Sequence, residues 1–199
     1  LRDALMANRA DRFPGTIEFF PDEGKYHLDG HRACGTRLQP EETRSRGGLC
    51  PVCGAPVTVG VLNRVRELAD RKTPEVAEGS PGFSSLVPLS EIIGELLGVG
   101  PASGGVKRQY ARLVSRFGSE LSLLLDAELE DLGADSPLLA EGIARVRRGE
   151  VTRLGGYDGE YGTIRLFGPG ELPEGVEVLP GDRRRAVRSP RKGGAACRP

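Results

Sequence analysis

The chain has 199 residues with 28 basic and 28 acidic side chains, so its formal net charge at pH 7 is zero. This balance gives no overall field that would indicate a polyanionic partner, and the length suits one ordinary domain or two small ones. No apolar run approaches the roughly 18 residues of a membrane span, and no segment has the pattern of a signal peptide.

Residues 1–30 are predicted to be the C-terminal end of a preceding domain. Residues 1–12 suggest a short helix, after which Pro14-Gly15 favours a turn. The run Thr16–Phe20 is rich in β-forming residues and is stopped by Pro21, which predicts a strand. A lone strand is not stable and needs a partner, and none is evident later in the chain.

Two matching motifs follow, and each has two candidate metal ligands three positions apart with a glycine next. The first is His31-x-x-Cys34-Gly35 and the second is Cys50-x-x-Cys53-Gly54. A tight turn at this spacing points both donors at one ion, and the glycine lets backbone amides fold toward the thiolate. Two such turns complete a tetrahedron, so the sequence predicts one structural zinc ion bound by His31, Cys34, Cys50 and Cys53.

Other interpretations of these residues explain less of the pattern. A redox pair or a disulfide between Cys50 and Cys53 leaves the His31/Cys34 half unexplained, and no helix-forming segment directly follows as a thioredoxin-like motif requires. His27 is a rival for the fourth ligand, but it breaks the symmetry of the two motifs. With four protein ligands the zinc has no open position for water or substrate, so it would hold a small ribbon together. This use of cysteine suits a reducing cytoplasm.

The zinc ribbon is expected to span residues 31–60 and to end in a strand at Val57–Val59. From Val61 the period changes, because apolar residues at positions 61, 62, 65, 68 and 69 fall on one face of a helix. Three arginines lie off that face, and they either cover a solvated helix surface or contact the phosphates of a nucleic acid. They are Arg64, Arg66 and Arg71.

Residues 61–150 are predicted to form a small helical bundle, interrupted over 73–88 by a Pro-, Gly- and Ser-rich connection that we expect to be a mobile loop or hinge. Four further helices are expected at about 91–97, 106–117, 121–132 and 138–148, with their apolar residues in the core. The residues that predict their starts and stops are Ser90 with Gly98, Ser103 with Gly118, Gly133, and Ser136 with Pro137.

Residues 151–180 are predicted to form a short β element. The Gly-rich segment 155–162 precedes a strand at Thr163–Phe167, lacks the terminal Lys-Ser/Thr of a P-loop and does not follow a strand. It is therefore either a hairpin turn or a substrate-touching loop with two exposed tyrosines. From Asp182 onward there are seven Arg or Lys and one acid, so we expect residues 181–199 to be a basic, disordered tail with Cys197 as a free thiol.

The predicted fold class is α+β, with a small zinc ribbon followed by a small helical bundle and a short β element. No catalytic residue is predicted. Both histidines lie beside the zinc motifs, which leaves no Ser/His/Asp or Cys/His arrangement for nucleophilic catalysis. The acids between Asp126 and Asp131 alternate faces of one predicted helix, as a solvated surface would.

Several segments together resemble the endonuclease Q family. They are Glu23–Arg32 running into Cys34, the Cys50-Pro51-x-Cys53-Gly54 motif, Gly60–Arg71, Val87–Ile93, Tyr110–Glu120 and Gly156-Tyr157-Asp158-Gly159-Glu160-Tyr161-Gly162. The match runs in order over roughly residues 14 to 168. The combination is far more specific than any one of its motifs.

The resemblance implies a DNA repair nuclease. Members of this family carry an N-terminal PHP-type metal-dependent phosphoesterase domain, then a zinc-binding domain and a helical domain, and they cut DNA on the 5′ side of deaminated or abasic nucleotides. This chain has no counterpart of the His- and Asp-rich motifs that bind the catalytic metals there. We therefore expect it to start near the end of the PHP domain, with the sheet partners of the strand at 16–20 upstream. Catalytic divalent metals are expected only in that missing domain, and this chain alone is expected to be inactive.

The hypothesis that follows is a DNA-binding and lesion-recognition part, because a damaged base must leave the stack before an enzyme can inspect it. The alternative is a zinc-stabilised protein-interaction module attached to another enzyme or helicase. The balanced charge favours the alternative, whereas the family resemblance favours the partner being DNA. Salt-dependent DNA binding would discriminate between the two.

Overall fold

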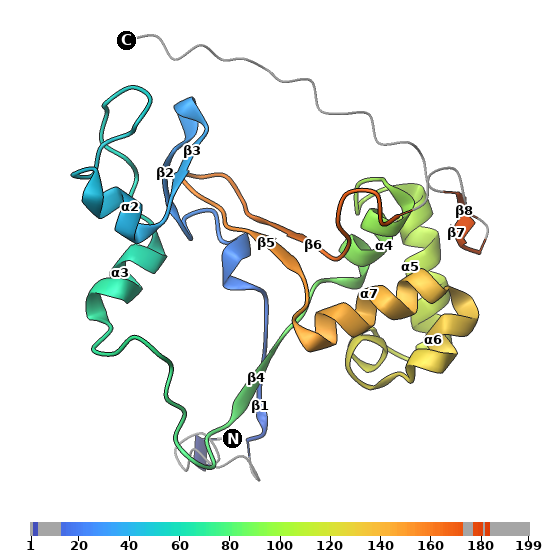
Figure 1. Ribbon diagram of the computed structural model, residues 1–199. Helices are drawn as coiled ribbons and strands as arrows, with labels where there is room; N and C mark the ends of the chain where they lie inside the picture. Colours follow the sequence, from blue (N-terminus) through green and yellow to red (C-terminus); the bar gives the residue numbers. More distant parts are fainter. Residues whose placement is uncertain (1, 4–12, 173–176, 181, 184–199) are drawn as a thin grey trace. The chain divides into compact units, whose positions relative to one another are not determined.

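The computed structural model describes residues 2–3, 13–172, 177–180 and 182–183, and it has two compact units. The ribbon unit takes its described residues from the first 84 positions and from 153–164, and the helical unit takes the rest. Helices and short two-stranded sheets occur together (Figure 1), so the predicted α+β class is confirmed. Most of the helix predicted over 1–12 and nearly all of the tail predicted over 181–199 lie outside the described residues.

A hairpin forms the first half of the ribbon. Strands β2 (Asp29–His31) and β3 (Thr36–Leu38) pair antiparallel and are joined by the 3-10 turn η2 (Arg32–Cys34). The short helix α2 (Pro40–Ser45) follows β3. The chain then returns to the hairpin, where Gly30 and Thr58 exchange two backbone hydrogen bonds of 2.9 and 2.8 Å. This bridge fixes the second cysteine motif beside the first.

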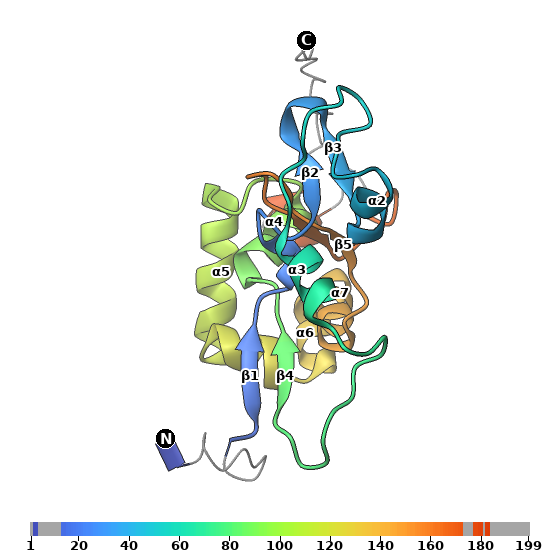
Figure 2. The same cartoon turned by 90° about the vertical axis from the view of Figure 1, so that its left-hand side faces the viewer.

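The strand predicted at 16–20 is present, and its partner lies later in the chain. Strand β1 (Gly15–Glu18) pairs with β4 (Gly82–Ser85), and Figure 2 shows the two side by side. The expectation that no downstream segment pairs with β1 is therefore wrong. The pattern missed β4 because its sequence Gly-Phe-Ser-Ser has little β-forming character, whereas backbone pairing requires no particular side chain.

Helix α3 (Val61–Leu68) confirms the predicted helix from Val61, although it ends before Ala69. Its start is fixed by the fully buried Asp29, whose carboxylate accepts the Gly60 N–H and the Asn63 side-chain amide, each at 2.6 Å. A carboxylate at this place satisfies an amide of the helix start that has no partner within the helix. The apolar face of α3 has no buried residue, since Val61, Val65 and Leu68 are each more than half exposed.

The helical unit is built around four helices and a π-helical turn. They are α4 (Leu89–Leu97), α5 (Gly104–Phe117), the turn η3 (Ser122–Asp126), α6 (Leu129–Asp135) and α7 (Pro137–Arg148). Leucine and isoleucine at helical spacing form its core, as predicted, and their burial stabilises the unit. The fully buried members include Leu89, Ile92, Ile93, Leu96, Leu113, Leu132, Leu139 and Ile143. No described helix is both long and apolar enough to span a membrane.

The predicted helix starts are confirmed at α5 and α7 but not at α4. The Ser103 and Ser136 hydroxyls each accept, at 3.3 Å, a backbone N–H from the first turn of the helix that follows. Helix α4 begins one residue before Ser90, the predicted cap, and the Leu89 N–H donates instead to the Glu120 carboxylate at 2.8 Å. A distant carboxylate thus takes the place of the expected local cap.

The single helix predicted over 121–132 is in fact divided. The turn η3 ends at Asp126, and α6 begins at Leu129 and continues past Gly133 to Asp135. Arg147 of α7 donates to the carbonyls at the break, at 2.7 to 3.1 Å; these belong to Leu123, Leu124 and Ala127. The carbonyls are therefore satisfied by a side chain where the helical ladder stops.

Two short sheets complete the described chain. Strands β5 (Thr152–Leu154) and β6 (Thr163–Arg165) pair on either side of the Gly-rich segment 155–162, as expected for a hairpin connection. The expectation that this segment does not follow a strand is wrong, because β5 ends directly before it. Strands β7 (Glu177–Leu179) and β8 (Asp182–Arg183) pair antiparallel. A 3-10 turn, η1 (Pro21–Glu23), precedes β2.

Candidate metal centre

The hairpin supplies two of the four predicted ligands. His31 is the last residue of β2 and Cys34 the last of η2, so two residues lie between them. Gly35 has a φ of 62°, which L side chains rarely adopt, and its N–H closes the turn on the Arg32 carbonyl at 3.0 Å. The glycine that follows the first motif is therefore needed for the backbone to turn back into β3.

The second motif repeats this construction in the loop after α2. The Gly54 N–H donates to the Cys50 carbonyl at 2.9 Å, and Gly54 has a φ of 73°. Cys50 is buried and packs with Leu38 and Val57, whereas Cys53 is exposed. One edge of the group is thus embedded in the small apolar core of the ribbon and the other faces solvent.

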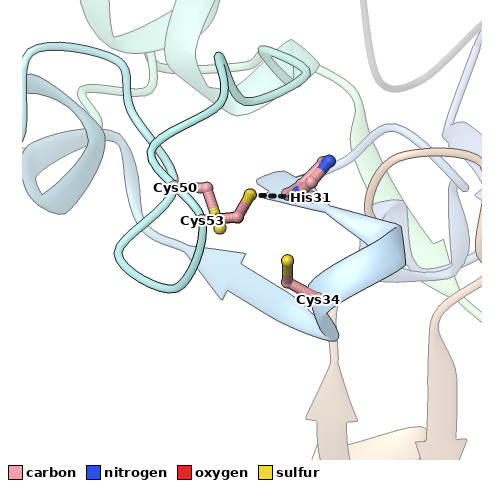
Figure 3. A group of neighbouring side chains, drawn as sticks. All are labelled: His31, Cys34, Cys50 and Cys53. Carbon is pink, nitrogen blue, oxygen red and sulfur yellow. Dashed lines mark hydrogen bonds between the residues drawn. The ribbon is translucent and has the colours of Figure 1, made fainter. Parts of the chain in front are cut away.

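The four donor side chains meet in one place. Their ligand atoms all lie within 4.8 Å of one another, and the Cys53 sulfur is 3.3 Å from His31 Nδ1 (Figure 3). The group can therefore hold a metal ion, and it is the one such group of three or more His, Cys, Asp or Glu among the described residues. His27 is not among these four residues, and its Nε2 lies 3.7 Å from an Asp22 carboxylate oxygen.

The surroundings of Cys50 favour the thiolate. Burial raises the pKa of its thiol, but hydrogen bonds from the Thr36 hydroxyl, from backbone amides at 52 and 53 and from His31 outweigh that effect and lower the pKa to about 6. The Thr36 oxygen lies 3.4 Å from the sulfur. A thiolate is the form in which cysteine binds metal, so this arrangement agrees with a ligand role.

The loop 155–162, which we call the clasp, runs along the segment before the hairpin. Backbone hydrogen bonds of 2.8 to 3.0 Å tie Gly156, Gly159 and Gly162 to residues between Asp22 and Leu28. A Cβ on Gly162 would lie 1.9 Å from the Asp22 carbonyl oxygen, and one on Gly156 would lie 2.4 Å from that of Gly24. These glycines therefore serve close backbone approach rather than phosphate binding.

Asp158 at the tip of the clasp fastens both halves of the ribbon. Its carboxylate accepts the Arg32 N–H, directly after His31, and the Thr58 hydroxyl, beyond the second motif, each at 2.6 Å. Both hydrogen bonds lower the pKa of the Asp158 carboxyl, and the one from Thr58 has the larger effect. Asp158 also holds a φ of 43°, uncommon for a residue with a Cβ. A Tyr-Asp-Gly turn is visible in the sequence, but no local pattern indicates which groups the Asp158 carboxylate contacts.

The two tyrosines of the clasp differ. Tyr157 is buried, with its ring against Gly30, where a Cβ would lie 2.3 Å from the ring, and with the Arg37 guanidinium 4.6 Å from the ring centre. Tyr161 is 73% exposed. The interpretation of the clasp as a loop with two exposed tyrosines is therefore wrong for Tyr157.

The three arginines singled out for phosphate contact are all exposed, and each has an acidic partner. Arg64 pairs with Glu67 at 2.7 Å, Arg66 with Glu41 at 3.8 Å, and Arg71 with Asp70 at 2.9 Å. Arg64 and Arg66 lie on α3 and Arg71 lies beyond its end. Ion pairs at such exposed positions are weak, so the arginines are not locked in these partnerships.

Comparison with known proteins agrees with this architecture. A family model described as the MJ0043 C-terminal domain matches residues 88–150. Protein MJ0043, an uncharacterized protein of Methanocaldococcus jannaschii, is 35% identical over 144 residues, which are 72% of this chain and 18% of that protein.

Two solved structures share the fold. The lesion-specific endonuclease PfuEndoQ from Pyrococcus furiosus has 34% identity and a TM-score of 0.67 over 80% of this chain and 38% of its own. Endonuclease Q in complex with a 27-mer duplex containing an abasic lesion has 33% identity and a TM-score of 0.64, over 83% and 40%. The chain thus spans less than half of each of these proteins. In sequence and in fold, this chain is similar to the matching part of endonuclease Q.

Proposed function

We propose that this chain is the DNA-binding and lesion-recognition part of an endonuclease-Q-like repair nuclease that incises DNA 5′ of deaminated or abasic nucleotides. The likeness to PfuEndoQ over 80% of the chain carries this proposal. The related endonuclease Q in complex with a lesion-containing duplex supports DNA as the partner. A damaged nucleotide has to leave the base stack to be inspected, and the two units would help to hold the duplex while it does so.

Zinc is the metal that the donor set of the ribbon unit fits best. Three thiolates and one imidazole are typical of structural zinc sites, and four protein ligands complete its tetrahedron. His31, Cys34, Cys50 and Cys53 would hold the ion. Bound there, zinc supplies cross-linking of the two motifs rather than catalysis, because no position is left open for water. The apolar cluster around Cys50 is small. The bound ion would therefore supply the stabilisation that a larger apolar core would otherwise provide.

The proposed DNA contacts are Arg64, Arg66 and Arg71, whose exposed carboxylate partners a phosphate could replace at little cost. Catalysis is assigned to a PHP-type domain outside this chain, together with its divalent metals. Among the described residues, the Cys/His group is the one candidate site for a metal, and it is of the closed type.

Binding and cleavage assays test this proposal together. Fluorescence anisotropy should show salt-dependent binding of the chain to a duplex with one abasic site, tighter than to the matched undamaged duplex. Incubation of the same duplexes with Mg²⁺ or Mn²⁺ should leave both strands intact. Equal affinity for the two duplexes would refute lesion recognition, and incision 5′ of the lesion would refute the assignment of catalysis elsewhere.

The alternative, a zinc-stabilised protein-interaction module, is favoured by two observations on α3. The apolar side chains of α3 are exposed, and its arginines are paired with acids. Absence of any DNA binding at low salt, with the metal bound and the chain folded, would favour this alternative.

A further inference from the structure

Two tyrosines far apart in the sequence share a cation on the ribbon unit. Tyr26 is 46% exposed and Tyr161 is 73% exposed. The Lys25 ammonium lies 5.6 Å from the centre of the Tyr26 ring and 5.8 Å from that of Tyr161. Both rings therefore approach one exposed lysine, and we call these three side chains the tyrosine surface.

The clasp holds this surface in place through its backbone. The Gly159 N–H donates to the Lys25 carbonyl at 2.9 Å, and the Gly162 N–H donates to the Glu23 carbonyl at 3.0 Å. These bonds lie on either side of Tyr161. The glycines leave no room for a Cβ at position 162, so the two backbones are in direct contact. Tyr26 and Tyr161 are thus presented by a fixed frame rather than by a free loop.

The remaining tyrosines have structural roles, which sets these two apart. Tyr157 is buried, and the Tyr110 hydroxyl donates to Glu120 at 2.8 Å within the helical unit. A second cation, Arg32, stands next to the clasp with its guanidinium 3.2 Å from Glu160 and largely exposed. The tyrosine surface, with Arg32 beside it, therefore offers two exposed rings and two cationic side chains to solvent.

We propose that the tyrosine surface stacks against unpaired bases of DNA, with Lys25 beside the backbone phosphates. This inference rests on the proposed function and names the surface that would contact the damaged site in DNA. Aromatic faces combined with cations bind unpaired nucleotides without regard to sequence, because every base has a π-face. At an abasic site the opposite base loses its pairing partner and the bases that flank the lesion lose a stacking partner, and a rigid ring supplies a new one. Recognition of this kind requires no hydrogen bond to a particular base.

The test uses the full, zinc-loaded chain and a duplex with one tetrahydrofuran abasic analogue. Tyr26→Ala and Tyr161→Ala should each weaken binding by about tenfold, the scale of one lost base–ring contact. Tyr161→Phe keeps the ring and should stay within about twofold of the wild type. Phe83→Ala is the matched control, because Phe83 is 72% exposed in the same unit but lies outside the tyrosine surface. The affinity of this variant for the duplex should equal that of the wild type.

Tyrosine fluorescence gives an independent readout, since the chain has four tyrosines and no tryptophan. Saturating DNA should quench the wild type, and Tyr161→Ala should lose a large part of that quenching. Wild-type affinity in both alanine variants would overturn the inference while leaving the proposed function intact. If Tyr161→Phe bound DNA as weakly as Tyr161→Ala, the hydroxyl rather than the ring would make the contact, and the stacking proposal would be wrong. Failure of the wild type to bind any DNA would overturn both proposals.

Discussion

At the scale of single residues, the metal centre depends on groups that differ in burial. Cys50 is embedded beside Leu38 and Val57, whereas Cys53 is exposed and approaches His31. Replacing the exposed thiol therefore tests metal binding with little disturbance of packing. Replacing the buried one would also open a cavity, so that the two effects could not be separated.

Cys53→Ser should lower the zinc content of the purified protein from about one ion per chain to well below it after dialysis against a chelator. Elemental analysis and a colorimetric zinc-release assay measure this directly. The control is Cys197→Ser, in the part of the chain predicted to be a basic tail, which should keep its zinc. Equal retention of zinc by both variants would exclude Cys53 as a ligand.

Asp158 is the second residue whose role is local and testable. Asp158→Ala leaves the Arg32 N–H and the Thr58 hydroxyl without their acceptor, so the ribbon unit should lose about 1–3 kcal/mol of stability. Thr58→Val removes one of the same two bonds and should have less effect. In a double-mutant cycle the two changes should be non-additive, as expected for direct partners. Additive losses of unfolding free energy would show that the hydrogen bond contributes nothing.

At the scale of elements, the clasp explains why a Gly-rich segment is needed between β5 and β6. Gly156 and Gly162 lie against backbone, and the clasp holds Asp158 and Tyr157 over the hairpin. The β-hairpin is short, and isolated two-stranded sheets are marginally stable. The clasp and the metal therefore act on the same weak element, one through hydrogen bonds and one through ligation.

Gly162→Ala should displace the clasp, because its Cβ would meet the Asp22 carbonyl at 1.9 Å. The expected loss is about 1–3 kcal/mol of unfolding free energy, the usual penalty for overpacking. Gly82→Ala is a suitable control, since a Cβ there meets nothing within 4 Å. Chemical denaturation of the two variants measures the difference. A Gly162→Ala protein as stable as the control would mean that the clasp does not pack in this way.

At the scale of the whole molecule, the two units are stabilised differently. The helical unit has a core of fully buried leucine and isoleucine side chains, whereas the buried cluster at the metal centre comprises Leu38, Cys50 and Val57. Apolar burial supports the first, and metal ligation is proposed to support the second. The two units should therefore respond separately to loss of the metal.

Chelation of the metal should raise hydrogen exchange in residues 29–58 and leave the amides of α4, α5 and α7 protected. Hydrogen exchange followed by mass spectrometry resolves these segments, because local opening is measured amide by amide. Re-addition of zinc should restore protection in the ribbon. Protection of residues 29–58 that persists without metal would show that the ribbon folds unaided.

The charge distribution gives the remaining prediction. Deletion of residues 184–199, with their excess of Arg and Lys, should weaken binding to damaged and undamaged DNA alike and flatten the salt dependence. In the shortened protein, alanine at Arg64, Arg66 and Arg71 should remove up to about 1 kcal/mol of binding per lost phosphate contact. Anisotropy titrations over a range of salt measure both effects. Unchanged affinity of the triple variant, with its circular dichroism intact, would assign the arginines to a solvated surface.

The sequence by itself determined the features that depend on near neighbours in the chain. The two ligand motifs, the caps Ser103 and Ser136, and the helical stripes of α3 and α5 are all readable because spacing of three or four residues fixes their geometry. The resemblance to endonuclease Q was likewise readable, since it lay in the order of such motifs.

Tertiary structure alone decided which distant segments meet. Three such contacts join groups more than thirty residues apart, which no local pattern indicates. They are the pairing of β1 with β4, the hydrogen bond from the start of α4 to Glu120, and the hydrogen bonds of Asp158 with Arg32 and Thr58. The approach of Tyr26 and Tyr161 to Lys25 belongs with them. Backbone pairing and carboxylate hydrogen bonds accept many partners, so only the packing of the whole unit selects one.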